Sequence, residues 1–115
     1  MSDIKELQNK IRKFAVDRDW KQFHNHKDMA ISLVLEATEV LEHFQWKTPR
    51  EVLERVKTHK EELEEELADV AIYLFELAEN LNINLKRAVI KKLEKNAKKY
   101  PVEKSKGKHT KYTEL

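Results

Sequence analysis

Glycine and proline are almost absent from this chain, which has one glycine and two prolines in 115 residues. Both residue types mark turns and breaks between short elements, so a chain that nearly lacks them is suited to a few long helices. Charged residues make up 38% of the chain and apolar residues 40%. The apolar residues recur at three- and four-residue spacing, which indicates amphipathic helices rather than disorder. An all-α fold is therefore predicted.

Helix-capping sequences divide the chain into its expected elements. Thr48, Pro49 and Glu51 supply a capping threonine, a proline at the first helical position and a glutamate at the third, which together are a strong helix start. Thr58 and Glu61 repeat the capping pattern. The expected helices begin at Asp3, at the cap Asp28 with an end near Trp46, at Thr48, at Lys60 with an end near Asn80, and at a cap on Asn82 or Asn84 with Pro101 as the stop.

This order of elements predicts a four-to-five-helix bundle that forms one domain over 1–101. A basic tail over 102–115 follows and is expected to be mobile or docked on a partner. A chain of 115 residues makes a modest core, so oligomerisation is expected to complete it.

The composition excludes several classes of function. The chain has no cysteine, which rules out disulfides, thiolate nucleophiles and cysteine-ligated zinc. A net charge of +2 provides no strong basic field for nucleic acid. No stretch approaches about 18 consecutive apolar residues, and the charged N-terminus lacks the apolar core of a signal peptide. A cytoplasmic location without membrane association is expected.

Two expected helices carry a narrow acidic strip. At 100° per residue, each strip gathers polar side chains on one side of its helix, while apolar side chains cover the opposite side. The first strip contains Ser32, Glu36, Glu39 and His43. The second strip contains Glu62, Glu66, Asp69, Tyr73 and Glu76.

Each strip contains two carboxylates three residues apart, Glu36 with Glu39 and Glu66 with Asp69. Side chains at this spacing lie about 5–6 Å apart, so each pair can point at one place. If the strips face each other, four carboxylates converge, and their repulsion favours a hard divalent cation such as Mg²⁺ or Mn²⁺. Magnesium suits phosphoryl chemistry. Spacing alone also leaves open an ordinary solvated acidic face.

A series of segments carries a resemblance to a known family. They are Arg18-Asp19-Trp20-Lys21-Gln22-Phe23-His24, Leu35-Glu36-Ala37-Thr38-Glu39, Phe44-Gln45-Trp46, Glu64-Glu65-Glu66-Leu67-Ala68-Asp69-Val70-Ala71-Ile72-Tyr73, Lys92 and Asn96 ahead of Tyr100-Pro101, and Lys111-Tyr112-Thr113-Glu114-Leu115. Together, over nearly the whole chain, they resemble the MazG-like all-α nucleotide pyrophosphohydrolases, in particular the dCTP pyrophosphatase branch.

The resemblance implies a Mg²⁺-dependent enzyme that converts a nucleoside triphosphate, dCTP or a modified dCTP, to the monophosphate and pyrophosphate. It implies a role in cleaning the nucleotide pool and assembly as a dimer or tetramer. It assigns catalysis and metal ligation to Glu36, Glu39, Glu66 and Asp69. The substrate-binding residues that it implies are Trp20, His24, Trp46, Tyr73, Lys92 and Asn96.

Two departures from the family pattern concern the base site. The first acidic pair lies in Leu35-Glu36-Ala37-Thr38-Glu39, where relatives often have small glycine-flanked glutamates, and Ile11 stands where some relatives have a histidine. The preference for a base therefore stays open.

The residues also bear on functions other than nucleotide pyrophosphohydrolysis by a dCTP pyrophosphatase. A di-iron carboxylate bundle requires Glu-x-x-His on two helices, and none of the five histidines has a glutamate three residues before it. His24 and His26 form an H-x-H but lack a third nitrogen or sulfur ligand nearby, so loop packing is favoured over a metal site. A non-enzymatic interaction or nucleic-acid-binding protein that uses the lysine-rich C-terminal part, and a pyrophosphohydrolase of phosphoribosyl-ATP, stay open.

Overall fold

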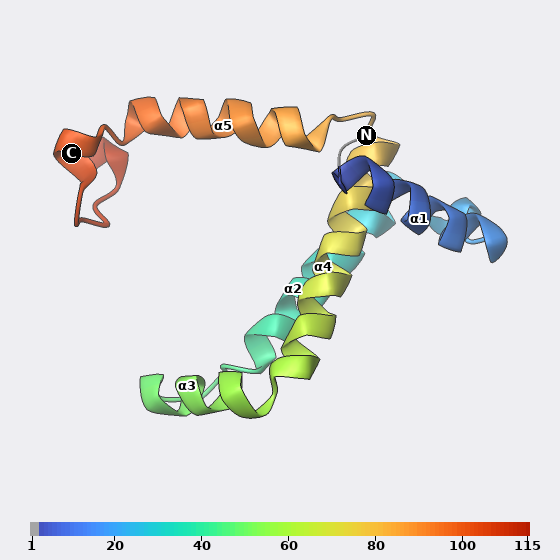
Figure 1. Ribbon diagram of the computed structural model, residues 1–115, viewed down its shortest axis with the longest axis horizontal. Coiled ribbons are helices and arrows are strands. Elements are labelled where there is room, and N and C mark those ends of the chain that lie inside the picture. Colours follow the sequence, from blue (N-terminus) through green and yellow to red (C-terminus); the bar gives the residue numbers. More distant parts are fainter. Residues whose placement is uncertain (1–2) are drawn as a thin grey trace. The chain divides into compact units, whose positions relative to one another are not determined.

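The computed structural model describes residues 3–115, and all regular elements in this range are helical (Figure 1). The α-helices are α1 Asp3–Asp17, α2 His26–Glu42, α3 Pro49–Thr58, α4 Lys60–Asn80, α5 Leu85–Lys99 and α6 Val102–Ser105. Two 3-10 turns, η1 Lys21–Phe23 and η2 Tyr112–Glu114, complete the structure. The prediction of an all-α fold is confirmed.

The chain forms two compact units, 1–83 and 84–115. In the first unit α2 and α4 lie side by side over most of their length, and α1 and α3 each pack against α4 (Figure 1). His24, two residues before α2, contacts Glu76 in the C-terminal half of α4. His43, the residue after α2, contacts Glu66 in the N-terminal half, so the two helices are antiparallel. The sequence-based division into a domain over 1–101 and a tail over 102–115 stays a prediction.

Capping side chains explain where α2 and α3 begin. Thr48 Oγ1 accepts a hydrogen bond from Glu51 N, and the Glu51 carboxylate accepts one from Thr48 N, each at 3.2 Å. This is the expected capping box, with Pro49 as the first helical residue. For α2 the expected cap, Asp28, is wrong. The cap is Asn25, whose Oδ1 accepts from Asp28 N at 2.8 Å and so opens the helix two residues before Asp28.

Two further expected helix ends are also wrong. Thr58 does not cap α4, because it is still helical in α3 and its hydroxyl donates to the Glu54 carbonyl at 3.1 Å. His59 lies between the two helices and provides no side-chain cap. The helix α2 ends at Glu42 rather than near Trp46, and the chain then turns until Trp46 adopts a left-handed conformation with φ 64°.

The second unit folds back on itself at its C-terminal end. Asn84 caps α5 by accepting from Arg87 N at 3.0 Å, and α5 ends two residues before Pro101. The Tyr100 and Tyr112 rings meet edge to face, with centroids 5.8 Å apart. Within the tail, Gly107 takes the positive φ of 74° that glycine adopts without strain.

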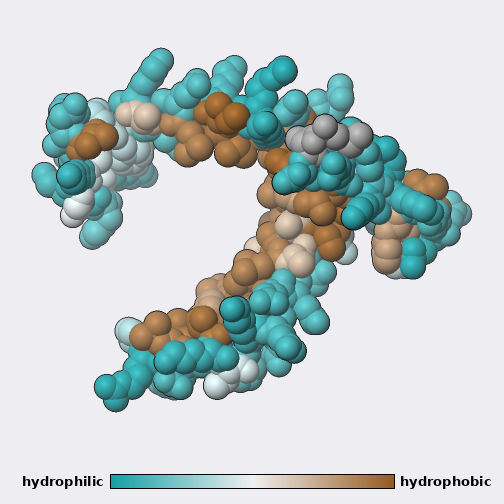
Figure 2. All heavy atoms as spheres, viewed as in Figure 1, coloured by the Kyte–Doolittle hydropathy of each residue, from teal (hydrophilic) through white to brown (hydrophobic). Residues whose placement is uncertain are grey.

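Very few apolar side chains are buried in this chain. Among the described residues Ala15, Met29, Leu63 and Ala78 form the buried apolar set, whereas large apolar side chains are exposed along the helices of both units (Figure 2). No helix in the described range is long and apolar enough to cross a membrane. The apolar faces of these helices are therefore left without a partner inside their own unit.

The capping box at Thr48 gives a direct test of the helix boundaries. Thr48→Ala removes the side-chain acceptor of α3 and is expected to lower the free energy of unfolding by about 1 kcal/mol. Thr58→Ala is the matched control. Because Thr58 caps nothing, its loss is expected to stay within about 0.5 kcal/mol. Urea unfolding at one fixed protein concentration measures both, and equal losses would contradict the assigned helix starts.

Candidate active site

The two acidic strips face each other across the α2–α4 pair. Glu36, Glu66 and Asp69 are only partly exposed, whereas Glu39 is exposed. The negative charges of Glu39, Glu66 and Asp69 all act on the carboxyl group of Glu36. The four carboxylates singled out in the sequence therefore lie near enough for the other three to act on Glu36.

The pKa of Glu36 responds to this crowding. Burial, the largest cause, raises its pKa above the ordinary value of 4.5. A hydrogen bond with the Glu39 carboxyl and the negative charges of Glu39, Asp69 and Glu66 raise the pKa further. Two carboxyl groups can share a hydrogen bond only when one of them is protonated. Burial and crowding therefore favour the protonated form of Glu36.

Two of the carboxylate oxygens, Glu36 Oε2 and Glu66 Oε2, have almost no exposed surface. Glu66 Oε2 lies against His43 Nε2, whereas Glu36 Oε2 accepts no hydrogen bond in the described part of the chain. No ion pair within residues 3–115 reaches Glu36 or Asp69. A buried carboxylate oxygen without a partner is costly, so this place has an unmet demand for a positive charge.

A buried histidine lies beside one of these oxygens. His43 follows the last residue of α2 and is only 4% exposed. Its Nε2 contacts Glu66 Oε2. Its Nδ1 accepts a hydrogen bond of 3.1 Å from Arg55 Nε on α3. His43 therefore links Arg55 of α3 to Glu66 of α4.

Tyr73 lies one turn beyond Asp69 on α4 and belongs to the same site. Burial is the largest cause that raises the pKa of its hydroxyl above 10.0, and the charges of Glu36, Asp69 and Glu76 add to it. A hydrogen bond with Ser32 of α2 acts in the opposite direction. The raised pKa keeps the hydroxyl protonated, so Tyr73 can donate a hydrogen bond to a phosphate or sugar oxygen.

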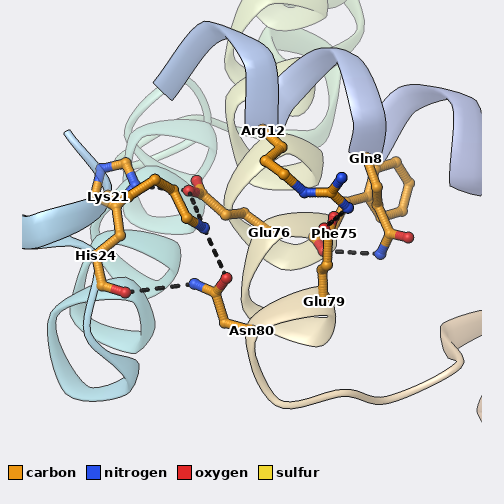
Figure 3. A network of polar contacts seen from close by, with 8 residues as sticks. All are labelled: Gln8, Arg12, Lys21, His24, Phe75, Glu76, Glu79 and Asn80. Atoms are coloured by element: carbon orange, nitrogen blue, oxygen red, sulfur yellow. Dashed lines mark hydrogen bonds and ion pairs between the residues drawn. The ribbon is translucent and has the colours of Figure 1, made fainter. Parts of the chain in front are cut away.

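A second polar cluster holds the chain before α2 against the C-terminal half of α4 (Figure 3). Glu76 is 4% exposed and accepts from His24 Nδ1 at 2.6 Å, with Lys21 Nζ at 3.6 Å. Lys21 also donates to Asn80 Oδ1 at 2.9 Å. His24, predicted to bind substrate, is thus engaged through one ring nitrogen in holding η1 on α4.

The same stretch of α4 also fixes α1 (Figure 3). Arg12 pairs with Glu79, and Gln8 Nε2 donates to the Phe75 carbonyl at 2.9 Å. Gln8 is 7% exposed, so this hydrogen bond satisfies a buried amide.

The two tryptophans predicted to hold the base lie at opposite ends of the α2–α4 pair. Lys21, the residue after Trp20, contacts Glu76, whereas His43, three residues before Trp46, contacts Glu66. Ten residues of α-helix span about 15 Å. Trp20 is 45% exposed and Trp46 is 92% exposed. One chain of the first unit therefore does not sandwich a base between them.

Lys92 and Asn96 lie on α5 in the second unit. Lys92 is exposed and Asn96 is partly exposed, and the Asn96 carbonyl accepts from Tyr100 N at 2.9 Å. Their assignment to the phosphates stays a prediction.

Sequence reasoning missed the part played by Arg55. The residue lies on a short exposed helix among other charged residues, and nothing in the pattern distinguishes it. The sequence indicated the burial of Glu76 only weakly, through its helical spacing from Asp69 and Tyr73 on the same strip.

Comparison with known proteins yields a family and several relatives. The model of the MazG-like family matches residues 31–115. The dCTP pyrophosphatase 1 of Rattus norvegicus is 43% identical, and that of Homo sapiens is 39% identical; each match covers 100% of this chain and 67% of the relative. The crystal structure of a pyrophosphatase from Archaeoglobus fulgidus DSM 4304 superposes with a TM-score of 0.83. It shares 41% identity and covers 88% of this chain and 94% of that one.

The paired acidic helices and these relatives define the class of protein, an all-α nucleotide pyrophosphohydrolase. Within that class the chain belongs to the MazG-like family, as its sequence motifs predicted. The non-enzymatic reading of its lysine-rich C-terminal part is set aside.

The pyrophosphatase family indicates a requirement for a divalent metal without identifying it. As placed in the structure, no three His, Asp or Glu side chains among residues 3–115 are grouped closely enough to hold a metal ion. The chemistry of the site nonetheless fits one. Its donors are carboxylate oxygens, which hard divalent cations prefer, and Glu36 Oε2 is buried without a partner.

The raised pKa of Glu36 predicts a pH dependence of stability. The folded state takes up the proton more readily than the unfolded state, so the metal-free protein loses stability as pH rises from about 4.5 through the raised pKa. Glu36→Gln removes this loss. In EDTA the variant is expected to be more stable than the parent at neutral pH, and the difference is expected to shrink below pH 4.5. Urea unfolding across pH measures it.

Glu51→Gln is the control with the opposite sign. The backbone hydrogen bond at Thr48, the largest cause, lowers the pKa of Glu51, so its charge stabilises the fold above pH 4.5 and this is lost as pH falls through the lowered pKa. This variant is expected to be less stable than the parent at neutral pH. A Glu36→Gln protein that is also less stable there would contradict the crowding at Glu36.

Proposed function

We propose that this enzyme uses Mg²⁺ to hydrolyse dCTP or a modified dCTP to the monophosphate and pyrophosphate, and so cleans the nucleotide pool. The observation that carries the proposal is Glu36, a partly buried carboxylate that three others crowd and that pairs with no cationic side chain of the described residues. The relatives named dCTP pyrophosphatase 1, about 40% identical over the whole chain, support dCTP as the substrate.

The residues that would hold the metal are Glu36, Glu39, Glu66 and Asp69. Oxygen donors favour Mg²⁺, with Mn²⁺ as the alternative. When bound, the cation neutralises the triphosphate and supports attack at the α-phosphorus. One carboxylate of the set takes the proton of the attacking water as general base. Tyr73 donates its hydroxyl proton to a phosphate or sugar oxygen, and His24 contacts the substrate through its second ring nitrogen.

The base site draws on exposed aromatic rings. A nucleobase stacks on a tryptophan face, and Trp46 offers nearly its whole surface. Since Trp20 and Trp46 lie at opposite ends of the helix pair, a sandwich of the base takes one tryptophan from each of two chains. Lys92 and Asn96 of α5 serve the phosphates in the same assembly.

The central test is a panel of deoxynucleoside and ribonucleoside triphosphates incubated with Mg²⁺, with phosphoribosyl-ATP included. Release of pyrophosphate is expected, with the highest kcat/KM for dCTP or a modified dCTP, and EDTA is expected to abolish it. Glu39→Ala and Asp69→Ala are each expected to lower kcat/KM by about 100-fold or more, since loss of groups that merely support a metal site already costs 10- to 100-fold. Lys10→Glu, an exposed change on α1, serves as the control.

The outcomes separate the parts of the proposal. Absence of pyrophosphate with every nucleotide would refute the function. Release that Glu39→Ala and Asp69→Ala leave unchanged would refute the site while the function stands. Preference for phosphoribosyl-ATP would replace the substrate only.

The exposed apolar faces support self-association as a dimer or tetramer. On α2 the polar strip is turned toward α4, so the opposite face exposes large apolar side chains, among them Val34 and Leu41, each 64% exposed. These two are seven residues apart and share one side of the helix. Exposed apolar surface of this extent is typical of an interface between protein chains.

Val34→Asp with Leu41→Asp places two charges on this face and is expected to shift the protein to a smaller species. Sedimentation velocity on the parent, the double variant and Lys10→Glu measures the shift. Circular dichroism reports whether the variant keeps its helices. A parent that sediments as a monomer would contradict the proposed assembly, and so would a folded variant that sediments like an oligomeric parent.

Two partners expected to be absent, membrane and nucleic acid, and the cytoplasmic location stay predictions of the sequence.

A further inference from the structure

His43 is the only imidazole in the described range with a separate partner at each ring nitrogen and burial above 95%. Arg55 Nε donates to its Nδ1 at 3.1 Å. Glu66 Oε2 lies against its Nε2. A buried polar ring in such a position is held from both sides rather than tolerated.

The two contacts determine which nitrogen carries the proton. An arginine guanidinium donates hydrogen bonds and accepts none, so Nδ1 must offer its lone pair. The ring proton therefore lies on Nε2, the nitrogen that faces Glu66. Arg55 thus selects the tautomer in which His43 presents an N–H to the carboxylate.

We propose that His43 is a positioning residue that holds Glu66 in place for the divalent cation, and that Arg55 orients His43 for this purpose. The N–H on Nε2 engages Glu66 Oε2 and leaves Oε1 as the oxygen for the cation. The proposal rests on the proposed function, because it takes Glu66 as a metal ligand. Partners of this kind orient metal-ligating side chains in many proteins.

The relay also gives α3 a role in the enzyme. This short helix is fixed at its start by the capping box at Thr48, and Arg55 lies in its last turn. The hydrogen bond from Arg55 crosses to the end of α2, and His43 crosses from there to α4. The segment between the two acidic helices therefore sets the orientation of one of their carboxylates.

A purely structural role makes a different prediction. If the relay only fastens α3 to the α2–α4 pair, its loss lowers the stability of the metal-free chain and leaves the affinity for the cation unchanged. A positioning role changes the affinity itself, in protein that remains folded.

The test measures binding of Mn²⁺ alone to the full chain by electron paramagnetic resonance and calorimetry, with no nucleotide present. His43→Leu is expected to weaken binding by about 10- to 100-fold. His43→Gln keeps an N–H donor at the end of the side chain and is expected to restore most of the affinity. His26→Leu, an exposed histidine at the start of α2, is the matched control and is expected to bind as the parent does.

Arg55→Met keeps the length of the side chain and removes the donor, so it is expected to weaken Mn²⁺ binding by about tenfold, less than His43→Leu. It also tests the proposal if His43→Leu fails to fold. Circular dichroism and urea unfolding in EDTA establish that each variant is folded before its affinity is compared.

Glu66→Ala separates the two levels of the proposal. If it abolishes Mn²⁺ binding while folded His43→Leu and Arg55→Met bind like the parent, the positioning role is overturned and the metal site stands. If Glu66→Ala binds like the parent, Glu66 is no ligand, and the metal site falls together with the positioning role. Weak binding by His43→Leu that His43→Gln does not restore would also overturn the N–H assignment.

Discussion

Repulsion among buried carboxylates between α2 and α4 is the constraint on which the rest of the structure depends. Two antiparallel helices normally bury apolar stripes against each other. Here they turn Glu36, Glu66 and Asp69 toward each other, and Glu36 answers with a raised pKa and a hydrogen bond to another carboxyl group. Burial and repulsion at this interface favour the protonated form of Glu36, and a cation bound at the proposed site would relieve the same repulsion.

Because the polar faces of α2 and α4 point toward each other, their apolar faces are exposed. Because the polar strips occupy much of the space between α2 and α4, several large apolar side chains of both helices are left on the surface, for example Val34 and Leu67. Four small or medium apolar residues are the buried apolar set in the described range, too few to hold a chain of this length alone. The proposed catalytic site inside the helix pair and the proposed association through its outer faces thus rest on one arrangement.

The helices and the acidic strip on each of them could be predicted from the sequence, because an α-helix has a fixed number of residues per turn. This period places Glu36 with Glu39 and Glu66 with Asp69 wherever the helices lie. The sequence does not determine the direction in which each strip faces, since periodicity says nothing about which helix face meets which neighbour. The caps were harder, because an acceptor at Asn25 competes with the one expected at Asp28, and the chain uses the earlier. Contacts such as Arg55 to His43 depend on tertiary placement and leave no pattern.

The acidic strip on α4 has basic partners at its two ends but not in its middle. Glu66 at one end lies against the imidazole of His43, and Glu76 at the other end lies against Lys21 and a second imidazole. Asp69, which lies between these two ends, and Glu36 of α2 have no ion pair within residues 3–115. The described residues thus supply basic partners at the two ends of the strip and none in the middle. This arrangement suits the proposed metal site, because a protein cation in the middle would compete with the metal.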